Sequence, residues 1–176
     1  MSPVERVFLT LMLTREKLAA HTPFFNIMSK PSSVLIGMHE AGHITAHHYY
    51  NHKLGVVEIS DSSGSCTLPE QEVDTLSLIV CACAGKAAIN RLHRRRNSHN
   101  WRQSDDFKLA FKGALRLSEG DLEAGELLVK WAERKAGVLI EKNWKQVLLV
   151  TRALLSKGKL SGEELNKALG NGKAAA

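Results

Sequence analysis

Residues 33–50 read SVLIGMHEAGHITAHHYY and carry an HExxH pattern at their centre, formed by His39, Glu40 and His43. Side chains four residues apart lie on one face of a helix, so both imidazoles can bind one metal ion from the same side. Glu40 lies one step further round and can reach a water molecule on that ion. Neutral imidazole is a good zinc ligand, and a carboxylate beside the water can accept its proton. The segment therefore predicts a helix over 33–50 that binds Zn²⁺ through His39 and His43, with Glu40 as the catalytic base.

Two neighbours in the same segment have a structural interpretation. His47 lies one turn beyond His43. Three ligands in a row on a straight helix cannot converge on one ion, because the outer pair would lie about 12 Å apart along the axis. We therefore interpret His47 as a packed or exposed neighbour of the site. Gly42 costs a helix about 1 kcal/mol relative to alanine, so its presence predicts that another backbone approaches closely there.

The length and composition of the chain predict one mainly helical domain. It has 176 residues, of which 44% are hydrophobic and 24% charged, as in soluble globular proteins. Helical spacing of apolar residues is found in five further segments: 3–20, 70–92, from Ser104 onward, 120–142 and 143–156. Two short strands, 56–60 and 66–68, predict a hairpin. The predicted fold class is mainly α within α+β, a helical domain with a small β-hairpin.

The ends of the chain differ from its middle. Residues 1–30 are predicted to form an N-terminal helix and loop, and 31–169 the main domain. A capping-box pattern at Ser161 starts the last helix of that domain. The tail, 170–176, consists mostly of small residues and is predicted to be disordered.

The positive charge of the chain is moderate and partly local. The net charge is +6 at pH 7, the sequence pI is about 9.3, and one short run, Arg91–Arg96, holds four arginines. Such charge attracts acidic partners, nucleic acids among them. A run this short is usually a solvated helix end. We favour that interpretation over a nucleic-acid surface built from Arg91–Arg96 and Trp101.

Cysteine usage and the apolar segments favour a cytoplasmic protein. The three cysteines form no CxxC pair and no disulfide framework, which favours a reducing compartment. The apolar run 7–13 is too short to span a membrane, and its flanks suit a signal peptide poorly. Cys81 and Cys83 lie in a long apolar stretch and are interpreted as small buried hydrophobic residues.

Three segments together resemble the peptidase domain of the FtsH family of AAA proteases: HEAGH at 39–43, AGKAA at 84–88 and SDDFKLA at 104–110. That family has HEAGH, then a GGRxAEE-like helix, then an SND segment whose aspartate is the third zinc ligand. The match makes Asp106 the third ligand, with Asp105 in place of the family's asparagine and as the alternative ligand. By position alone, Asp106 is equally well explained as a first-turn acid that favours the helix dipole. The similarity covers about 33–168.

The resemblance also implies a substrate site and shows departures from the family pattern. The strand 56–60 falls where the family has a substrate-side edge strand, which makes Val56, Val57 and Ile59 the expected contacts of an extended peptide. Ile89 and Asn90 stand where the family has two glutamates. No G-x-x-x-x-G-K-S/T pattern occurs in the chain, so it has no ATPase motor of its own.

The expected function is that of a zinc-dependent endopeptidase acting on unfolded polypeptides, with a separate ATPase as a partner if folded proteins are degraded. The alternative is a zinc-binding regulatory module of the same fold without proteolysis, which the missing motor and the replaced glutamates would explain. Glu40 favours the enzyme, because a purely structural metal site has no need of a base beside its water.

Overall fold

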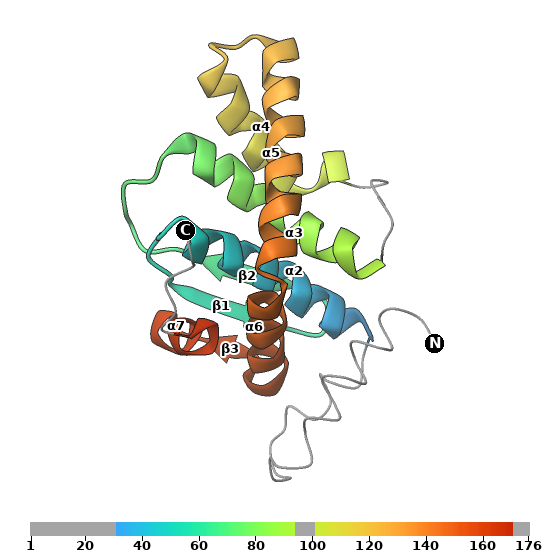
Figure 1. Cartoon of the computed structure of the whole chain (residues 1–176), viewed down its shortest axis with the longest axis vertical. Coiled ribbons are helices and arrows are strands. Elements are labelled where there is room, and N and C mark those ends of the chain that lie inside the picture. Colours follow the sequence, from blue (N-terminus) through green and yellow to red (C-terminus); the bar gives the residue numbers. More distant parts are fainter. Residues whose placement is uncertain (1–30, 94–100, 171–176) are drawn as a thin grey trace.

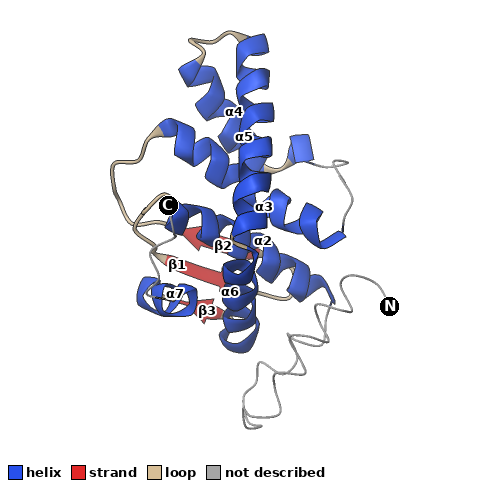
Figure 2. Ribbon diagram, viewed as in Figure 1, coloured by secondary structure: helices blue, strands red, loops and turns tan. Residues whose placement is uncertain are grey.

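The computed structural model describes residues 31–93 and 101–170, which are mainly helical with one small antiparallel sheet (Figures 1 and 2). The mainly helical class is thereby confirmed. The elements are, in chain order, α2 (Pro31–Tyr49), β1 (Val56–Ile59), β2 (Gly64–Thr67), α3 (Thr75–His93), the 3-10 helix η2 (Trp101–Gln103), α4 (Asp105–Leu117), α5 (Leu122–Lys142), α6 (Trp144–Lys157), β3 (Lys159–Leu160) and α7 (Gly162–Leu169). The helix predicted over 3–20 lies outside the described residues, as do 94–96 of the basic run and the tail from 171 onward.

Helix α2 is the element against which most of the others pack. It contacts α3, α6 and the strands β1 and β2 (Figure 1). Between 33 and 47 every side chain is buried except those at 35, 36 and 39, which are partly exposed. A helix that is covered on almost all sides belongs to the core. One of its few openings to solvent is therefore at His39, the first histidine of the HExxH pattern.

The contact between α2 and α3 is close enough to require glycine. A Cβ atom on Gly42 would lie 2.6 Å from the carbonyl oxygen of Ala84 and 3.0 Å from the Cβ of Ala88. Real Cβ atoms do not approach a backbone oxygen so closely, so only glycine lets the two helices touch at this point. The close backbone approach predicted from Gly42 is confirmed.

Helix α3 is a core helix that begins later than its apolar pattern predicts. Its Thr75–Leu92 segment is long and apolar enough to cross a membrane by composition, but 56% of that segment is buried, and the helix packs against α2, α4 and α5. The helix begins at Thr75 rather than Glu70 because the carboxylate of Asp74 accepts a hydrogen bond from the Ser77 N–H at 2.8 Å and caps the first turn.

The sheet has the strand order β2-β1-β3, and both pairings are antiparallel. Strand β3, which no sequence pattern predicted, pairs Leu160 with Val57 on the side of β1 away from β2. Strand β2 begins at Gly64 rather than Cys66, because a tight turn closed by the Ser60 N–H and the Ser63 carbonyl at 2.7 Å ends just before it.

The predicted role of β1 as a substrate-side edge strand is wrong. Both sides of β1 are occupied by other strands, so its backbone cannot pair with a peptide. Val57 and Ile59 are 0% and 4% exposed and face the core, and Val56 alone of the three predicted contact residues is exposed. A two-residue strand such as β3 leaves no periodicity in the sequence, which is why the central position of β1 was not foreseen. The sheet ends at β2 on one side and at the two-residue β3 on the other.

Helices α4 and α5 form a hairpin that projects away from the sheet (Figure 1). Their connection turns through Glu119 and Gly120, both with positive φ (51° and 89°). The capping box predicted at Ser161 is present, since Ser161 and Glu164 each bond the other's backbone N–H at the start of α7.

The close α2–α3 contact predicts how a methyl group added at Gly42 changes the stability of the fold. Gly42→Ala should lower the free energy of unfolding by roughly 1–3 kcal/mol, because the new Cβ must push the backbone of α3 away. Gly137→Ala is the matched control, since this exposed glycine inside α5 has open space around its Cβ position. That change should raise the free energy of unfolding by up to about 1 kcal/mol through helix propensity. Denaturant melts of both variants measure the two effects, and a neutral Gly42→Ala would contradict the packing argument.

Candidate metal centre

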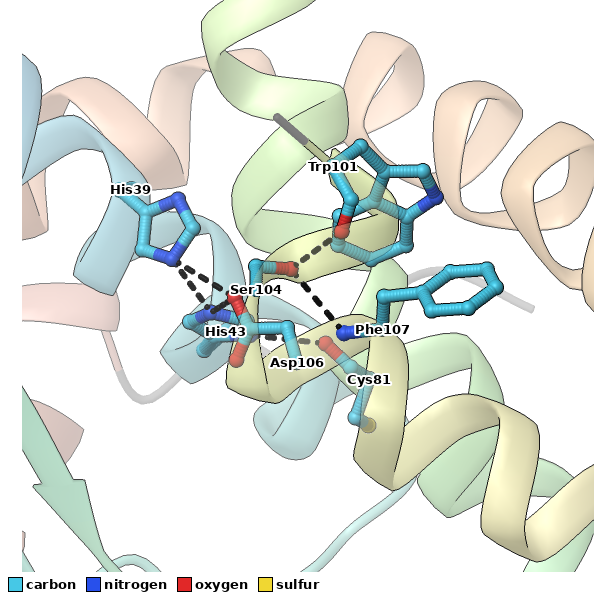
Figure 3. A network of polar contacts seen from close by, with 7 residues as sticks. All are labelled: His39, His43, Cys81, Trp101, Ser104, Asp106 and Phe107. Atoms are coloured by element: carbon cyan, nitrogen blue, oxygen red, sulfur yellow. Dashed lines mark hydrogen bonds and ion pairs between the residues drawn. The ribbon is translucent and has the colours of Figure 1, made fainter. Parts of the chain in front are cut away.

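The side chains of His39, His43 and Asp106 converge on one point, although Asp106 comes from a distant part of the chain (Figure 3). The Nε2 atoms of His39 and His43 are 3.0 Å apart. One carboxylate oxygen of Asp106 lies 2.9 Å from the first Nε2 and 3.3 Å from the second. The three donor atoms therefore form a small triangle at the partly exposed face of α2.

The donor set and its spacing fit zinc. Ligand atoms bound to Zn²⁺ at about 2.0–2.1 Å in a tetrahedron lie about 3.3 Å from one another, close to the three distances observed. Two imidazoles and one carboxylate are a ligand set of catalytic zinc sites, in which the fourth position is left to water or substrate. The side chains of His39 and Asp106 are 32% and 27% exposed, which leaves that fourth position accessible.

Asp106 is held in place by the start of α4. The Ser104 hydroxyl accepts a hydrogen bond from the Phe107 N–H at 3.1 Å and donates one to the Trp101 carbonyl at 2.7 Å (Figure 3). This N-cap fixes the first turn and directs Asp106 toward the histidines. Asp105, the alternative ligand, is 96% exposed and pairs with Lys108 instead. The geometry therefore favours Asp106 over Asp105 and over a role limited to the helix dipole.

The orientation of His43 is set by α3. Its Nδ1–H donates to the carbonyl of Cys81 at 2.8 Å, in a buried position. With the proton on Nδ1, the lone pair of Nε2 points toward His39 and Asp106, as a metal ligand requires. Gly85 leaves the room for both rings, because a Cβ at this position would lie 2.5 Å from the His43 Nε2.

The charges of the three donor residues are strongly coupled. Burial alone would raise the pKa of the Asp106 carboxyl, but hydrogen bonds with His39 and His43 outweigh it and hold that pKa well below its usual range. Burial alone would lower the pKa of His43, but the bond and the charge of Asp106 outweigh it and raise that pKa. The carboxylate thus draws positive charge to this point, and a divalent cation can replace the proton.

Glu40 lies on the same turn of α2 and is almost fully buried, with 6% of its surface exposed. Burial raises the pKa of its carboxyl above the usual value, and the neighbouring His43 and His39 only partly offset this. Its side chain packs against Gly64 at the start of β2, where a Cβ would lie 2.5 Å from the carboxylate oxygen. Glu40 is therefore positioned between the metal ligands and the terminal strand of the sheet.

The other residues singled out in the sequence have packing roles. Trp101 is only 9% exposed; its ring contacts Phe107 edge-on, and the Lys86 ammonium lies 4.6 Å from its centre. Arg91 pairs with Glu141 and stacks on Trp144. Ile89 packs against the core.

Sequence reasoning missed several residues that build the site. Gly64 and Gly85 leave room for the side chains of the site, and Cys81 contributes its backbone carbonyl, so none of the three contributes a reactive side chain to this centre. The one available signal was the pair Ala84-Gly85 inside a helical stretch, because small residues there predict a close contact.

The fold and the site together define a helical protein with a His-His-Asp centre and an adjacent buried glutamate. The sequence matches no known protein-family model, and it matches no curated protein.

Replacing each aspartate by asparagine tests which of the two, Asp105 or Asp106, is the third zinc ligand. Asp106→Asn should weaken zinc binding by more than the roughly 10–100-fold that follows loss of a hydrogen-bond partner behind a ligand. Asp105→Asn, which changes an exposed side chain of the same turn, should leave the affinity almost unchanged. Titration against a chromophoric zinc chelator measures both, with circular dichroism to confirm folding. Equal effects of the two changes would exclude Asp106 as the specific ligand.

Proposed function

We propose that this chain is a zinc-dependent endopeptidase, resembling the FtsH peptidase domain, that hydrolyses unfolded polypeptides. The observation that supports this most directly is the position of Glu40. A buried carboxylate stands one residue from His39 on the helix that supplies two ligand atoms. A metal site that served only to stabilise the fold would be closed by a fourth protein ligand and would have no use for a base.

The residues of the site have complementary parts in the proposed reaction. A bound zinc would lower the pKa of water toward about 7 and polarise the substrate carbonyl. Glu40 accepts the proton of the attacking water and passes it to the leaving amine. The raised pKa of its carboxyl suits this role, because a base works best when its pKa lies nearer the working pH. The Cys81 carbonyl keeps His43 in the tautomer that binds metal through Nε2, because it accepts the hydrogen bond of the Nδ1–H.

The proposed substrate site is the outer edge of β2, in place of the β1 edge expected from the sequence. Strand β2 is a terminal strand of the sheet, and its first residue, Gly64, packs against the Glu40 side chain. An extended peptide that paired with Gly64–Thr67 would gain main-chain hydrogen bonds with little demand on its sequence. Its backbone would then run past the catalytic base.

The proposal includes a cytoplasmic location and a separate ATPase partner for folded substrates. Three free thiols agree with a reducing compartment. The alternative, a zinc-binding regulatory module, rests on Ile89 and Asn90 in place of acidic residues. The following two experiments distinguish it, because that module would bind zinc and cut nothing.

Exchanging the base for its amide tests the catalytic role of Glu40. Glu40→Gln should bind zinc as the wild type does but cleave an unfolded casein-like substrate roughly 10²–10⁴-fold more slowly, because an amide cannot take up the proton. Glu123→Gln, an exposed glutamate of α5, is the control and should cleave normally. Equal cleavage by wild type and Glu40→Gln would mean that another base, or a contaminant, is responsible.

The absence of a phosphate-binding loop from the sequence predicts that peptidase activity of the purified chain is indifferent to ATP. Stable folded domains are unfolded only about 10⁻³–10⁻⁶ of the time, so without a motor they should resist, whereas the same protein in unfolded form is cut. The assay compares one substrate in both forms, with and without ATP. ATP-stimulated degradation of the folded form by the chain alone would contradict the proposal.

A further inference from the structure

A second cluster of metal-binding side chains lies at the end of α2, and it shares no ligand with the first. His47, His52 and Cys81 each offer one ligand atom, and these atoms all lie within 4.8 Å of one another. The Nδ1 atoms of the two histidines are 2.8 Å apart. This separation is similar to the 3.0 Å between the imidazoles of the first centre.

The backbone at the end of α2 brings the two histidines together. The His52 N–H bonds the His47 carbonyl at 2.9 Å, the Asn51 N–H bonds the His48 carbonyl at 3.0 Å, and Asn51 has a positive φ of 58°. These features make up a Schellman motif, in which the residue after the left-handed one folds back onto the last turn. The side-chain contact that accompanies this motif is usually between two apolar residues, but here the two residues are His47 and His52.

The hydrogen bonds of His52 leave its Nδ1 ready to bind. The Ser77 hydroxyl donates a hydrogen bond to the Asp74 carbonyl at 2.9 Å, so it accepts one from the His52 Nε2–H at 3.1 Å. The His52 Nδ1 therefore carries a lone pair directed at His47. The Tyr50 ring stacks on the His52 ring, with 5.9 Å between their centres. His52 is thus held in one tautomer and one orientation.

The other two members are buried and uncharged. Burial, together with His52 and His43, lowers the pKa of His47 to about 3, so its imidazole is neutral over the physiological range. Cys81 is 1% exposed, and burial raises the pKa of its thiol. A metal ion must therefore displace the thiol proton, and His47 must move its own proton from Nδ1 to Nε2. Both are ordinary requirements of His-Cys metal sites.

We propose that His47, His52 and Cys81 bind a second thiophilic metal ion, Zn²⁺, with two imidazole nitrogens and one thiolate as ligands. A thiolate with two imidazoles is a donor set for zinc, whereas carboxylates and carbonyls suit magnesium or calcium. The half-buried His52 leaves a route for the ion to enter. An ion here ties the end of α2 to α3, at the residue whose carbonyl orients His43.

Cobalt distinguishes the two centres, because a thiolate bound to Co²⁺ gives an intense near-ultraviolet charge-transfer band that imidazole and carboxylate ligands do not give. The metal-free protein titrated with Co²⁺ should bind two ions per chain and develop this band. His52→Ala and Cys81→Ser should each abolish the band and one ion. Asp106→Asn should weaken only the other ion and keep the band. Cys83→Ser is the control. Cys83 is as deeply buried on α3 as Cys81, but its thiol interacts electrostatically with Glu133 and Lys86 and is not part of the cluster.

The outcomes decide the proposal without relying on one variant. Absence of the band in the wild type, or its persistence in Cys81→Ser, would overturn it. Loss of the band in Cys83→Ser or Cys66→Ser, with Cys81→Ser unaffected, would also overturn it, because the thiolate would come from elsewhere. If Cys81→Ser fails to fold, His52→Ala decides, since this side chain is partly exposed and takes no part in the close α2–α3 contact at Gly42.

Discussion

The contact between the backbones of α2 and α3 is the constraint on which the rest of the structure depends. At Gly42 the two helices are so close that a methyl group would meet the carbonyl of Ala84. This closeness places the Cys81 carbonyl within 2.8 Å of the His43 Nδ1 and brings Gly85 beneath both imidazoles. If a methyl group at Gly42 pushed the two helices apart, the Cys81 carbonyl would move away from the His43 ring, which would lose the acceptor that sets its tautomer.

The third ligand reaches the same point by an independent route. Asp106 is carried by the first turn of α4, which is anchored by the Ser104 cap and by Trp101 packed between Phe107 and Lys86. Packing of α4 against α3 then brings the carboxylate to the histidines. Two of the three ligands are held by bonds outside the centre, His43 by the Cys81 carbonyl and Asp106 by the N-cap of its helix, and such support is what a metal site requires. In the proposed second site, α3 again supplies the partner for residues of α2.

Regular elements were predictable where one period persists over several turns. The helices from α4 to α6 begin within two residues of the segments whose apolar spacing predicted them, and Ser104 and Ser161 begin their helices as predicted. The errors lie in short or capped segments, where few residues decide. Strand β3 exists only because Lys159 and Leu160 follow the left-handed Gly158 and meet β1. That meeting makes β1 a central strand, and no local pattern encodes it.

For the candidate site, the sequence by itself determined what depends on local geometry: the shared face of His39 and His43, the adjacent base Glu40, and a close contact at Gly42. A helix has one period, so spacing along the chain specifies which side chains are neighbours. The tertiary structure alone decided which aspartate faces the histidines, which strand borders Glu40, and that the Cys81 carbonyl supports His43. His43 and Cys81 are 38 residues apart in the chain. Contacts over such separations arise from how the helices pack, and packing depends on the shapes of many side chains at once.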